Sequence, residues 1–398
     1  MIEPRTLKGF RDFLPKEARK RQYVIETLRK VFASYGFEPL ETPALEYEDI
    51  LMGKYGEEGD KLMYRFEDNG QRKVAMRYDQ TVPLARVVSQ YANSLPFPFK
   101  RYQIQNVWRA ENTQKGRFRE FLQCDIDTIG SNSPLSDAEI IACASTCLRA
   151  LGFNDYKILV NDRSIFKDVS NITVGAIDKL KKIGDQGVIE ELVTRGEYDS
   201  YQKAEEAILQ IKQSTPTEWI NQVIDSAISL GVLEDEILFA PTLARGLDYY
   251  TATVVEIEIN GYEAGSVGGG GRYDKLSELF SDQTLPAVGF AFGFDRLIEA
   301  MDELNLFPNT LTTTKVLVIN EGNGQEVVSI LRVKGVNAEI YLDSKATMEK
   351  QFKYAEKKEI PFVVVPLNET EVELRTKSSA GDIVKQTISI NNLPDAIK

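Results

Sequence analysis

The stretch RGLDYYTATVVEIEI occupies residues 245–259, and GSVGGGGRYDKL follows it at 265–276. The β-branched residues of the first segment predict a strand at 250–260. Strand alternation alone would place one of the adjacent residues Tyr249 and Tyr250 in the core and the other on the surface. The four consecutive glycines of the second segment either let the backbone approach a ligand closely or form a hairpin turn.

The next segment along the chain is PAVGFAFGFDRLIEAMD at 286–302, which predicts a strand that runs into a helix. The small residues Gly289, Ala291 and Gly293 leave space over the strand for a flat ligand, and Arg296 lies at the start of the helix. Glycines also serve close packing of a strand against a helix. The two interpretations remain open on this segment alone.

Two predicted strands at 100–130 flank a loop that is rich in Arg, Lys, Gln and Gly. Arg109 ends the incoming strand, and Arg117 and Arg119 begin the outgoing one. A guanidinium is always charged and donates two parallel hydrogen bonds, which suits a phosphate group. Taken alone, the segment is also typical of a solvated, charged hairpin.

The first half of the chain combines helices with short strands. Apolar residues at helical spacing predict a helix at 17–35, and a strand after it ends at Pro43. Several short strands then follow with turn-like gaps, which indicates antiparallel pairing. A helix is predicted at 136–151, with a capping box formed by Ser136 and Glu139.

The pattern divides the chain into three parts and predicts an α+β fold. Residues 161–240 show helical patterns with little strand signal and indicate a helical insertion into a main body at 1–160 and 241–310. The polar stretch 305–315 is the predicted linker. The unit at 314–398 alternates strand and helix and ends in a predicted hairpin, which indicates a sheet covered by helices.

Composition limits the classes of function. The chain has 398 residues, 42% of them hydrophobic, and a net charge of −12, with 12 basic and 12 acidic residues from 314 onward. The acidic excess therefore lies in 1–313 and argues against a broad nucleic-acid-binding surface. We find no run of eighteen apolar residues and no secretory signal. The three cysteines form no CxxC pair, which favours a reducing cytoplasm.

The chain contains no histidine. This absence excludes histidine-based acid–base catalysis, catalytic triads with histidine and histidine metal sites. Three explanations of the absence remain open. A chain without histidine can be translated when histidine is scarce, the sequence was redesigned deliberately, or the absence is chance.

The segments around Pro43, Arg109 and Arg296 resemble, in order and spacing, the three motifs of class II aminoacyl-tRNA synthetases. The segments 245–259 and 265–276 are similar to the two histidine-specific signatures of the histidyl-tRNA synthetases. MRYDQTVPLAR at 76–86 and GFRDFLP at 9–15 also match that family, so the resemblance covers nearly the whole chain.

The resemblance implies a class II catalytic core with an antiparallel sheet at 1–160 and 241–310, an insertion that touches the tRNA acceptor arm, and an anticodon-binding domain at 314–398. It implies that histidine is activated with ATP to histidyl-adenylate and transferred to the 3′ end of tRNA(His). Mg²⁺ on the ATP phosphates, a cytoplasmic homodimer and no metal held by the protein itself are further implications.

The resemblance also assigns roles to residues of this sequence. Arg109 would hold the α-phosphate of ATP, Arg296 the γ-phosphate, and Arg117 would also contact ATP. Arg109 and Arg245 would be the catalytic residues. The histidine-binding residues would be Asp79, Thr81, Gln123, Asp127, Arg245, Tyr250 and Tyr273.

Two other functions are compatible with the same fold. A catalytically silent paralogue acts as the regulatory subunit of ATP phosphoribosyltransferase, but that group typically lacks an intact RGLDYY segment and the C-terminal unit. The other alternative is a non-enzymatic RNA-binding or stress-sensing module. Histidine-dependent exchange of pyrophosphate into ATP would distinguish the synthetase from both.

Overall fold

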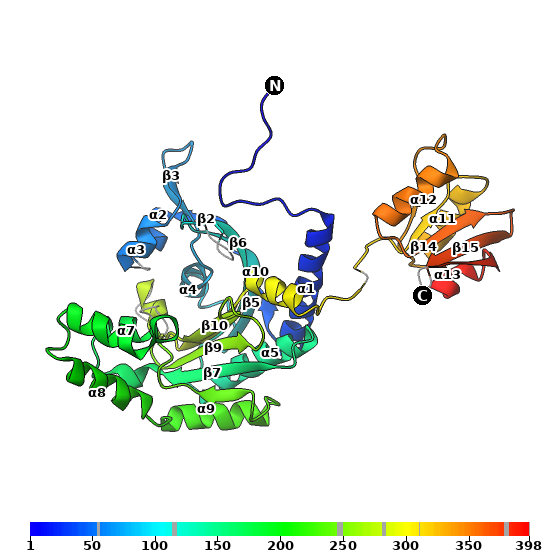
Figure 1. Ribbon diagram of the computed structural model, residues 1–398. Helices are drawn as coiled ribbons and strands as arrows, with labels where there is room; N and C mark the ends of the chain where they lie inside the picture. Colours follow the sequence, from blue (N-terminus) through cyan, green and yellow to red (C-terminus); the bar gives the residue numbers. More distant parts are fainter. Residues whose placement is uncertain are drawn as a thin grey trace. The chain divides into compact units, whose positions relative to one another are not determined.

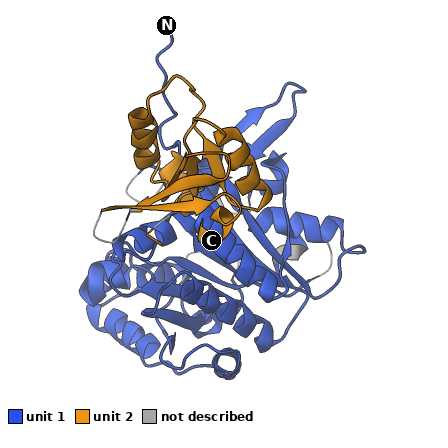
Figure 2. Cartoon of the chain, turned by 90° about the vertical axis from the view of Figure 1, so that its right-hand side faces the viewer, with its two compact units in different colours: residues 1–13, 21–307 blue, residues 14–20, 308–398 orange. Residues whose placement is uncertain are grey.

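A computed structural model describes most of the chain, namely residues 1–53, 56–113, 118–244, 250–280, 284–309, 311–377 and 382–397. The chain divides into two compact units (Figure 2). Unit 1 consists of Met1–Phe13 and Arg21–Phe307, and unit 2 consists of Leu14–Lys20 and Pro308–Lys398.

The centre of unit 1 is a large sheet, in which the described residues form eight strands (Figure 1). The two outermost pairs are parallel, and all the pairs between them are antiparallel. In spatial order the strands are β1 (Glu38–Pro39), β5 (Phe99–Trp108), β6 (Glu120–Ile129), β11 (Ala287–Gly293), β10 (Gly268–Arg272), β9 (Thr253–Ile259), β7 (Tyr156–Asp162) and β8 (Ile237–Phe239). The long β5–β6 hairpin confirms the antiparallel pairing that the sequence predicts.

One face of this sheet is buried under helices that share a single hydrophobic core with it. These helices are α1 (Pro15–Ser34), α5 (Pro134–Ala150), α9 (Glu218–Ser229) and α10 (Phe294–Glu303). Burial of their apolar side chains removes a large nonpolar area from water, which is the main force that holds the layers together.

The remaining described elements of unit 1 are a smaller sheet, further helices and 3₁₀ turns. A three-stranded sheet has the order β2 (Leu45–Tyr47), β4 (Lys73–Met76), β3 (Arg65–Glu67). The helices are α2 (Glu48–Leu51), α3 (Gly56–Lys61), α4 (Thr81–Gln90), α6 (Asn171–Ile177), α7 (Leu180–Thr194) and α8 (Tyr201–Lys212), with 3₁₀ turns at Arg163–Phe166 and Leu276–Leu279.

The glycine run forms a strand in the middle of the sheet. β10 pairs with β9 on one side and with β11 on the other, so the hairpin-turn interpretation is wrong. A Cβ atom on Gly270 would lie 2.0 Å from the backbone oxygen of Gly289, and one on Gly271 would lie 2.4 Å from that of Thr253. Such distances are shorter than any van der Waals contact, so these positions require glycine.

Helix α5 begins earlier than the sequence indicates. Its cap is Ser133, whose side chain accepts a hydrogen bond from the amide of Leu135, and Pro134 occupies the first turn. Proline fits there because its fixed φ suits the helix and its missing N–H would have no partner. The predicted capping box is therefore wrong, and Glu139 pairs instead with Lys100 at 2.8 Å.

The predicted insertion at 161–240 contains two kinds of structure. Helices α6, α7 and α8 contribute to two small hydrophobic clusters of their own. Helix α9 belongs to the main core through Ile220, Val223 and Ala227, and strand β8 joins the large sheet. Strand β8 has only three residues, so its pattern was too short to be recognised in the sequence. The exact limits of the insertion stay a prediction.

Unit 2 has the alternating structure that the sequence predicts. Its sheet has the order β13 (Ala338–Ile340), β12 (Val316–Val318), β14 (Phe362–Pro366), β15 (Glu371–Lys377) and β16 (Ile383–Ser389). The first three strands are parallel, and the last two form an antiparallel hairpin. The helices are α11 (Gly324–Val333), α12 (Met348–Lys357) and α13 (Leu393–Ile397), of which the last was not predicted. The two units together confirm the α+β fold.

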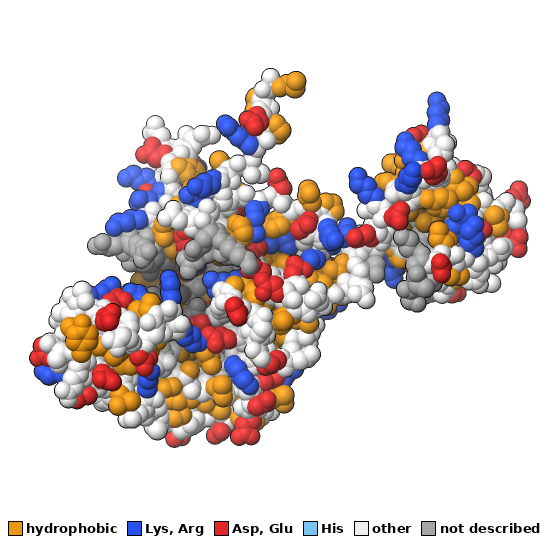
Figure 3. Space-filling view, viewed as in Figure 1, with side chains coloured by type: hydrophobic (Ala, Val, Ile, Leu, Met, Phe, Trp, Pro, Cys, Tyr) orange, Lys and Arg blue, Asp and Glu red, His pale blue; other side chains and the backbone are white. Residues whose placement is uncertain are grey.

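No helix within the described part of the chain combines the length and the apolar character needed to cross a bilayer. On the face that Figure 3 shows, basic side chains are interspersed with acidic ones and do not gather into one broad basic surface. This agrees with the acidic net charge of −12.

Candidate active site

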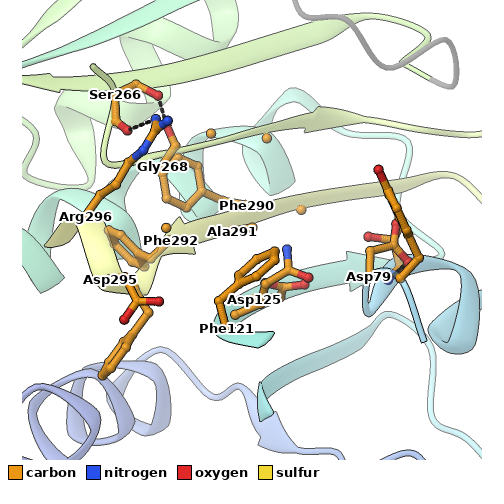
Figure 4. Close-up of a pocket in the computed structure, with 18 of the residues that line it drawn as sticks. Asp79, Phe121, Asp125, Ser266, Gly268, Phe290, Ala291, Phe292, Asp295 and Arg296 are labelled. Carbon is orange, nitrogen blue, oxygen red and sulfur yellow. Dashed lines mark hydrogen bonds between the residues drawn. The ribbon is translucent and has the colours of Figure 1, made fainter. Parts of the chain in front are cut away.

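The face of the large sheet opposite the main core carries a cavity of about 460 Å³ (Figure 4). Strand β6 shows how the two faces are separated. Phe121, Gln123, Asp125 and Asp127 line the cavity, whereas the residues between them, Leu122, Cys124 and Ile126, belong to the hydrophobic core. The alternation of a strand thus places four consecutive odd-numbered side chains in one row along the cavity.

One end of the cavity is built on a buried ion pair. Asp127 is 3% exposed and Arg101 is 0% exposed, and the Arg101 Nη2 atom lies 2.7 Å from the Asp127 Oδ2 atom. The two residues face each other across the β5–β6 pair. Burial raises the pKa of the Asp127 carboxyl, while Arg101 and the hydroxyl of Tyr273 oppose this shift.

The Tyr273 hydroxyl donates a hydrogen bond to the Asp127 Oδ1 atom. Tyr273 follows β10, and its amide donates to the Ala287 carbonyl of β11 at 2.7 Å, which fixes its position. Gly289 makes room for Asp127, because a Cβ atom there would lie 1.9 Å from Asp127 Oδ1. Tyr250 also lines the cavity, and a Cβ atom on Gly271 would lie 2.7 Å from its ring. The glycines therefore make space for the polar side chains of this end.

The N-terminus of α4 forms a second wall of the same end. The Asp79 Oδ1 atom accepts hydrogen bonds from the amides of Thr81 and Val82, each at 3.1 Å. These bonds satisfy amides that the first turn of a helix leaves without partners. Asp79 and Thr81 both line the cavity. These hydrogen bonds thus hold the Asp79 carboxylate beside Thr81 at the cavity wall.

Gln123 and Asp125 lie between Phe121 and Asp127 in the β6 row, the line of odd-numbered β6 side chains in the cavity. The Oε1 atom of Gln123 and the Oδ1 atom of Asp125 are buried, and neither has a hydrogen-bond partner among the described residues. Burial raises the pKa of the Asp125 carboxyl well above its ordinary value. The nearby carboxylates of Asp127 and Asp79 raise it further, and Arg101 opposes them.

The other end of the cavity is cationic. Arg109 follows β5, and its Nε atom donates a hydrogen bond to the Tyr78 carbonyl at 3.1 Å. Its guanidinium lies 4.4 Å from the centre of the Tyr78 ring and 5.1 Å from that of Phe121. Such contacts orient a guanidinium and leave its charge unneutralised, so it is suited to hold an anion.

Arg296 lies in the first turn of α10, and its Nη1 atom donates to the Ser266 carbonyl at 3.0 Å (Figure 4). The preceding residue, Asp295, also lines the cavity. Its carboxylate is paired with Arg11 at 2.9 Å and with Arg21 at 2.8 Å. These pairs tie the N-terminal segment and α1 to the start of α10.

The structure brings eight of the ten residues singled out in the sequence into this one cavity. They are Asp79, Thr81, Arg109, Gln123, Asp127, Tyr250, Tyr273 and Arg296. The other two, Arg117 and Arg245, lie outside the described residues. The individual roles of all ten stay predictions.

Sequence reasoning missed four residues of the site, namely Arg101, Phe121, Asp125 and Asp295. Phe121 and Asp125 were detectable, since they alternate with the core residues of a predicted strand that also holds Gln123 and Asp127. The pairing of Arg101 with Asp127 depends on the register of the hairpin, which the sequence does not reveal.

Comparison with known proteins decides the family. The family profile described as "Histidyl-tRNA synthetase" matches residues 9–214 and 176–297, and the profile "Anticodon binding domain" matches 315–398. The chain is 38% identical over 421 residues to a protein of Cytophaga hutchinsonii named "Histidine--tRNA ligase", and the match covers 92% of each chain. The chain belongs to the histidyl-tRNA synthetase family.

Solved structures agree with this assignment. The crystal structure of histidyl-tRNA synthetase from Nostoc sp. PCC 7120 is 30% identical and gives a TM-score of 0.86, with 100% of this chain and 99% of that chain covered. The class II synthetase fold is therefore confirmed. A structure from Bacillus halodurans, titled as an ATP phosphoribosyltransferase regulatory subunit/histidyl-tRNA synthetase, gives a TM-score of 0.69 at 19% identity and shares the fold.

Proposed function

We propose that this chain is a histidine–tRNA ligase, which activates histidine with ATP to histidyl-adenylate and transfers the histidyl group to the 3′ end of tRNA(His). The observation that supports this most directly is the single cavity with a carboxylate-rich end and a cationic end. The first end suits a ligand with nitrogen donors, and the second suits a polyphosphate. An amino acid and ATP are such a pair of substrates.

At the carboxylate end, Asp127, Tyr250 and Tyr273 bind the imidazole ring, and Asp79, Thr81 and Gln123 hold the amino and carboxylate groups of histidine. A pocket that hydrogen-bonds both ring nitrogens leaves its own buried polar groups unpaired with a wrong amino acid. This penalty gives discrimination of about 10⁴–10⁵-fold in comparable sites without an editing domain.

At the cationic end, Arg109 holds the α-phosphate of ATP and Arg296 the γ-phosphate. The histidine carboxylate attacks the α-phosphate, and pyrophosphate leaves in line with the attack. Negative charge increases on the α-phosphate in the transition state, so a fixed guanidinium stabilises the transition state more than the bound substrates. Arg245 acts on the same phosphate, and Arg117 contacts ATP, although both lie outside the described residues.

Mg²⁺ is expected as a companion of ATP. Within the described residues, no group of three or more acidic residues or cysteines has an arrangement that would hold a metal ion. Mg²⁺ would arrive on the ATP phosphates as part of the substrate.

The proposal also covers tRNA binding, homodimer formation and the cellular compartment. Unit 2 binds the anticodon, and its helix α12 offers Lys350, Lys353 and Lys357 for that contact. Part of that surface is a solvated helix face, because Lys353 pairs with Glu349 at 2.7 Å. Homodimer formation and a cytoplasmic location rest on the resemblance to the family.

The decisive test is histidine-dependent exchange of radiolabelled pyrophosphate into ATP. Exchange is expected with histidine and not with the other amino acids, and a charging assay with tRNA(His) should follow the second step. A purified protein that binds ATP but shows no exchange would support the regulatory paralogue instead. The comparisons do not favour that alternative, because the chain matches histidine–tRNA ligases over nearly its full length and has the anticodon-binding domain.

A further inference from the structure

Asp125 is a cavity residue whose chemistry the proposed function leaves unused. Its side chain lies in the β6 row between Gln123 and Asp127, and the residue is 4% exposed. Its Oδ1 atom is buried and has no hydrogen-bond partner among the described residues. A buried carboxylate is costly unless a cation or several donors compensate it. The structure thus has an acceptor that points to a missing donor.

The surrounding charges make the missing donor a cation. The carboxylates of Asp79 and Asp127 contribute to the field at Asp125, together with the guanidinium groups of Arg101 and Arg109. Arg101 is already paired with Asp127, and Arg109 donates to the Tyr78 carbonyl at the other end of the cavity. Within the described residues, the carboxylates of Asp79, Asp125 and Asp127 therefore outnumber the guanidinium groups of Arg101 and Arg109 that act on Asp125.

The position of Asp125 along β6 suits an ammonium group better than an imidazole ring. Asp127 already accepts a hydrogen bond from the Tyr273 hydroxyl at Oδ1 and pairs with Arg101 through Oδ2. In the proposed histidine site, Asp127 and Tyr273 bind the imidazole ring. Asp125 lies two residues closer to Phe121 and Arg109, a distance of about 6.6 Å along a strand. In histidine, the α-nitrogen lies between the ring and the carboxylate that reacts.

We propose that Asp125 binds the α-ammonium group of the amino-acid substrate. The proposal rests on the proposed function and assigns to this site a specificity residue in addition to Asp79, Thr81 and Gln123. Figure 4 shows Asp125 in the middle of the cavity, between Arg296 on one side and Asp79 on the other. The substrate then supplies a cation to the Asp125 Oδ1 atom, which has no hydrogen-bond partner among the described residues.

The test compares ligands that differ in one group. Histidinol has the ring and the ammonium group but no carboxylate, and imidazolepropionate has the ring and the carboxylate but no ammonium group. Asp125→Asn keeps the shape and removes the charge. It is expected to weaken binding of histidine and histidinol by about 10- to 100-fold, the range for a hydrogen bond to a charged group. Binding of imidazolepropionate should change less than about twofold, since no ammonium contact is lost.

The matched control is Asp295→Asn, the same chemical change at the other end of the same cavity, where the carboxylate pairs with Arg11 and Arg21. It should leave histidinol binding unchanged in titration calorimetry. Asp125→Ser serves as a second variant, and a cooperative thermal transition shows that each variant is folded. Equal losses for all three ligands, or no loss for histidinol, would overturn the proposal.

The kinetic result separates this proposal from the function on which it rests. An ammonium contact is made in the ground state and in the transition state alike, so Asp125→Asn should raise KM for histidine and change kcat little. A wild-type protein without histidine-dependent exchange contradicts the function itself. A wild-type protein with normal exchange and an Asp125→Asn variant with an unchanged KM contradict only the role of Asp125.

Discussion

The two ends of the cavity hold their charged groups in different ways. At the carboxylate end, Asp127 is neutralised by Arg101 inside the protein, 2.7 Å away and out of contact with water. At the cationic end, Arg109 and Arg296 are half-buried and donate to the backbone carbonyls of Tyr78 and Ser266. A carbonyl fixes the direction of a guanidinium without cancelling its charge.

This difference shows how one cavity can combine selection with catalysis. The buried pair makes the carboxylate end rigid, and rigid polar groups discriminate strongly between ligands. The uncancelled guanidinium groups can respond to the charge that develops on a phosphate during the reaction. Substitutions at the first end should therefore affect stability and ligand choice, and those at the second end should affect rate.

The largest effect is expected from Arg101→Met, which leaves the Asp127 carboxylate buried without its partner. Breaking a buried ion pair in this way costs about 3–5 kcal/mol of unfolding free energy. Urea unfolding followed by circular dichroism measures the loss. The double variant Arg101→Met, Asp127→Asn removes both charges and should recover most of it. A single variant as stable as the wild type would show that the ion pair does not organise this end.

The second effect concerns rate. Arg109→Ala should lower the rate of histidine-dependent pyrophosphate exchange by about 10²–10³-fold, because one fixed donor to the transition state is worth about 2.7–4 kcal/mol. Arg245→Ala is expected to behave in the same way. The dissociation constant of histidine, measured without ATP, should stay within about twofold of the wild type for Arg109→Ala, which removes no proposed contact to histidine. For Arg245→Ala, histidine binding should weaken far less than the rate falls. A loss of histidine affinity equal to the loss of rate would remove the contrast between the two ends.

The third effect is a gain in stability. Because folding raises the pKa of Asp125, the folded protein binds more protons than the unfolded chain, and stability falls as the pH rises above the ordinary value of 3.8. Asp125→Asn removes this penalty and should be more stable than the wild type by about 1–3 kcal/mol at neutral pH. Denaturant unfolding at several pH values should show the difference growing from near zero below pH 3.8. A difference that is constant with pH would point to a cause other than the charge.

The smallest effect is expected at the edge of the cationic end. The Arg11 guanidinium pairs with Asp295 at 2.9 Å and lies 3.1 Å from the centre of the Phe118 ring, and both partners line the cavity. Arg11→Gln should raise KM for ATP by roughly three- to tenfold, or about 0.7–1.4 kcal/mol, with KM for histidine unchanged. Arg72→Gln, at an exposed pair with Asp68, is the matched control and should change neither constant.

The sequence predicts most of what depends on local pattern. The β5–β6 hairpin, helix α1 and the alternating structure of unit 2 follow from the spacing of apolar residues, which strands and helices express within a few residues. The resemblance to a family supplied ten candidate residues, and eight of them share the cavity.

The features that the sequence did not predict depend on distant parts of the chain. Arg101 faces Asp127 only because the hairpin has one particular register. The glycine run is a strand because β9 and β11 supply partners on both sides, and a short-range pattern contains neither partner. The cap of α5 is Ser133, three residues before the predicted Ser136, because Pro134 suits the first turn of the helix.

The glycine strand limits how the selectivity of this cavity can be redesigned. Beside Phe290, Ala291 and Phe292, the strands β10 and β11 line the cavity with backbone alone at Gly268, Gly269, Gly270 and Gly289. These glycines have no side chain to be shortened, so trimming these positions cannot enlarge the pocket for a bulkier histidine analogue. Atoms added at Gly268, Gly270 or Gly289 would collide with Asp127 or with the neighbouring strand. Larger analogues must gain their space at lining positions that carry side chains, such as Tyr250 or Thr81 of helix α4, which defines where a directed library should begin.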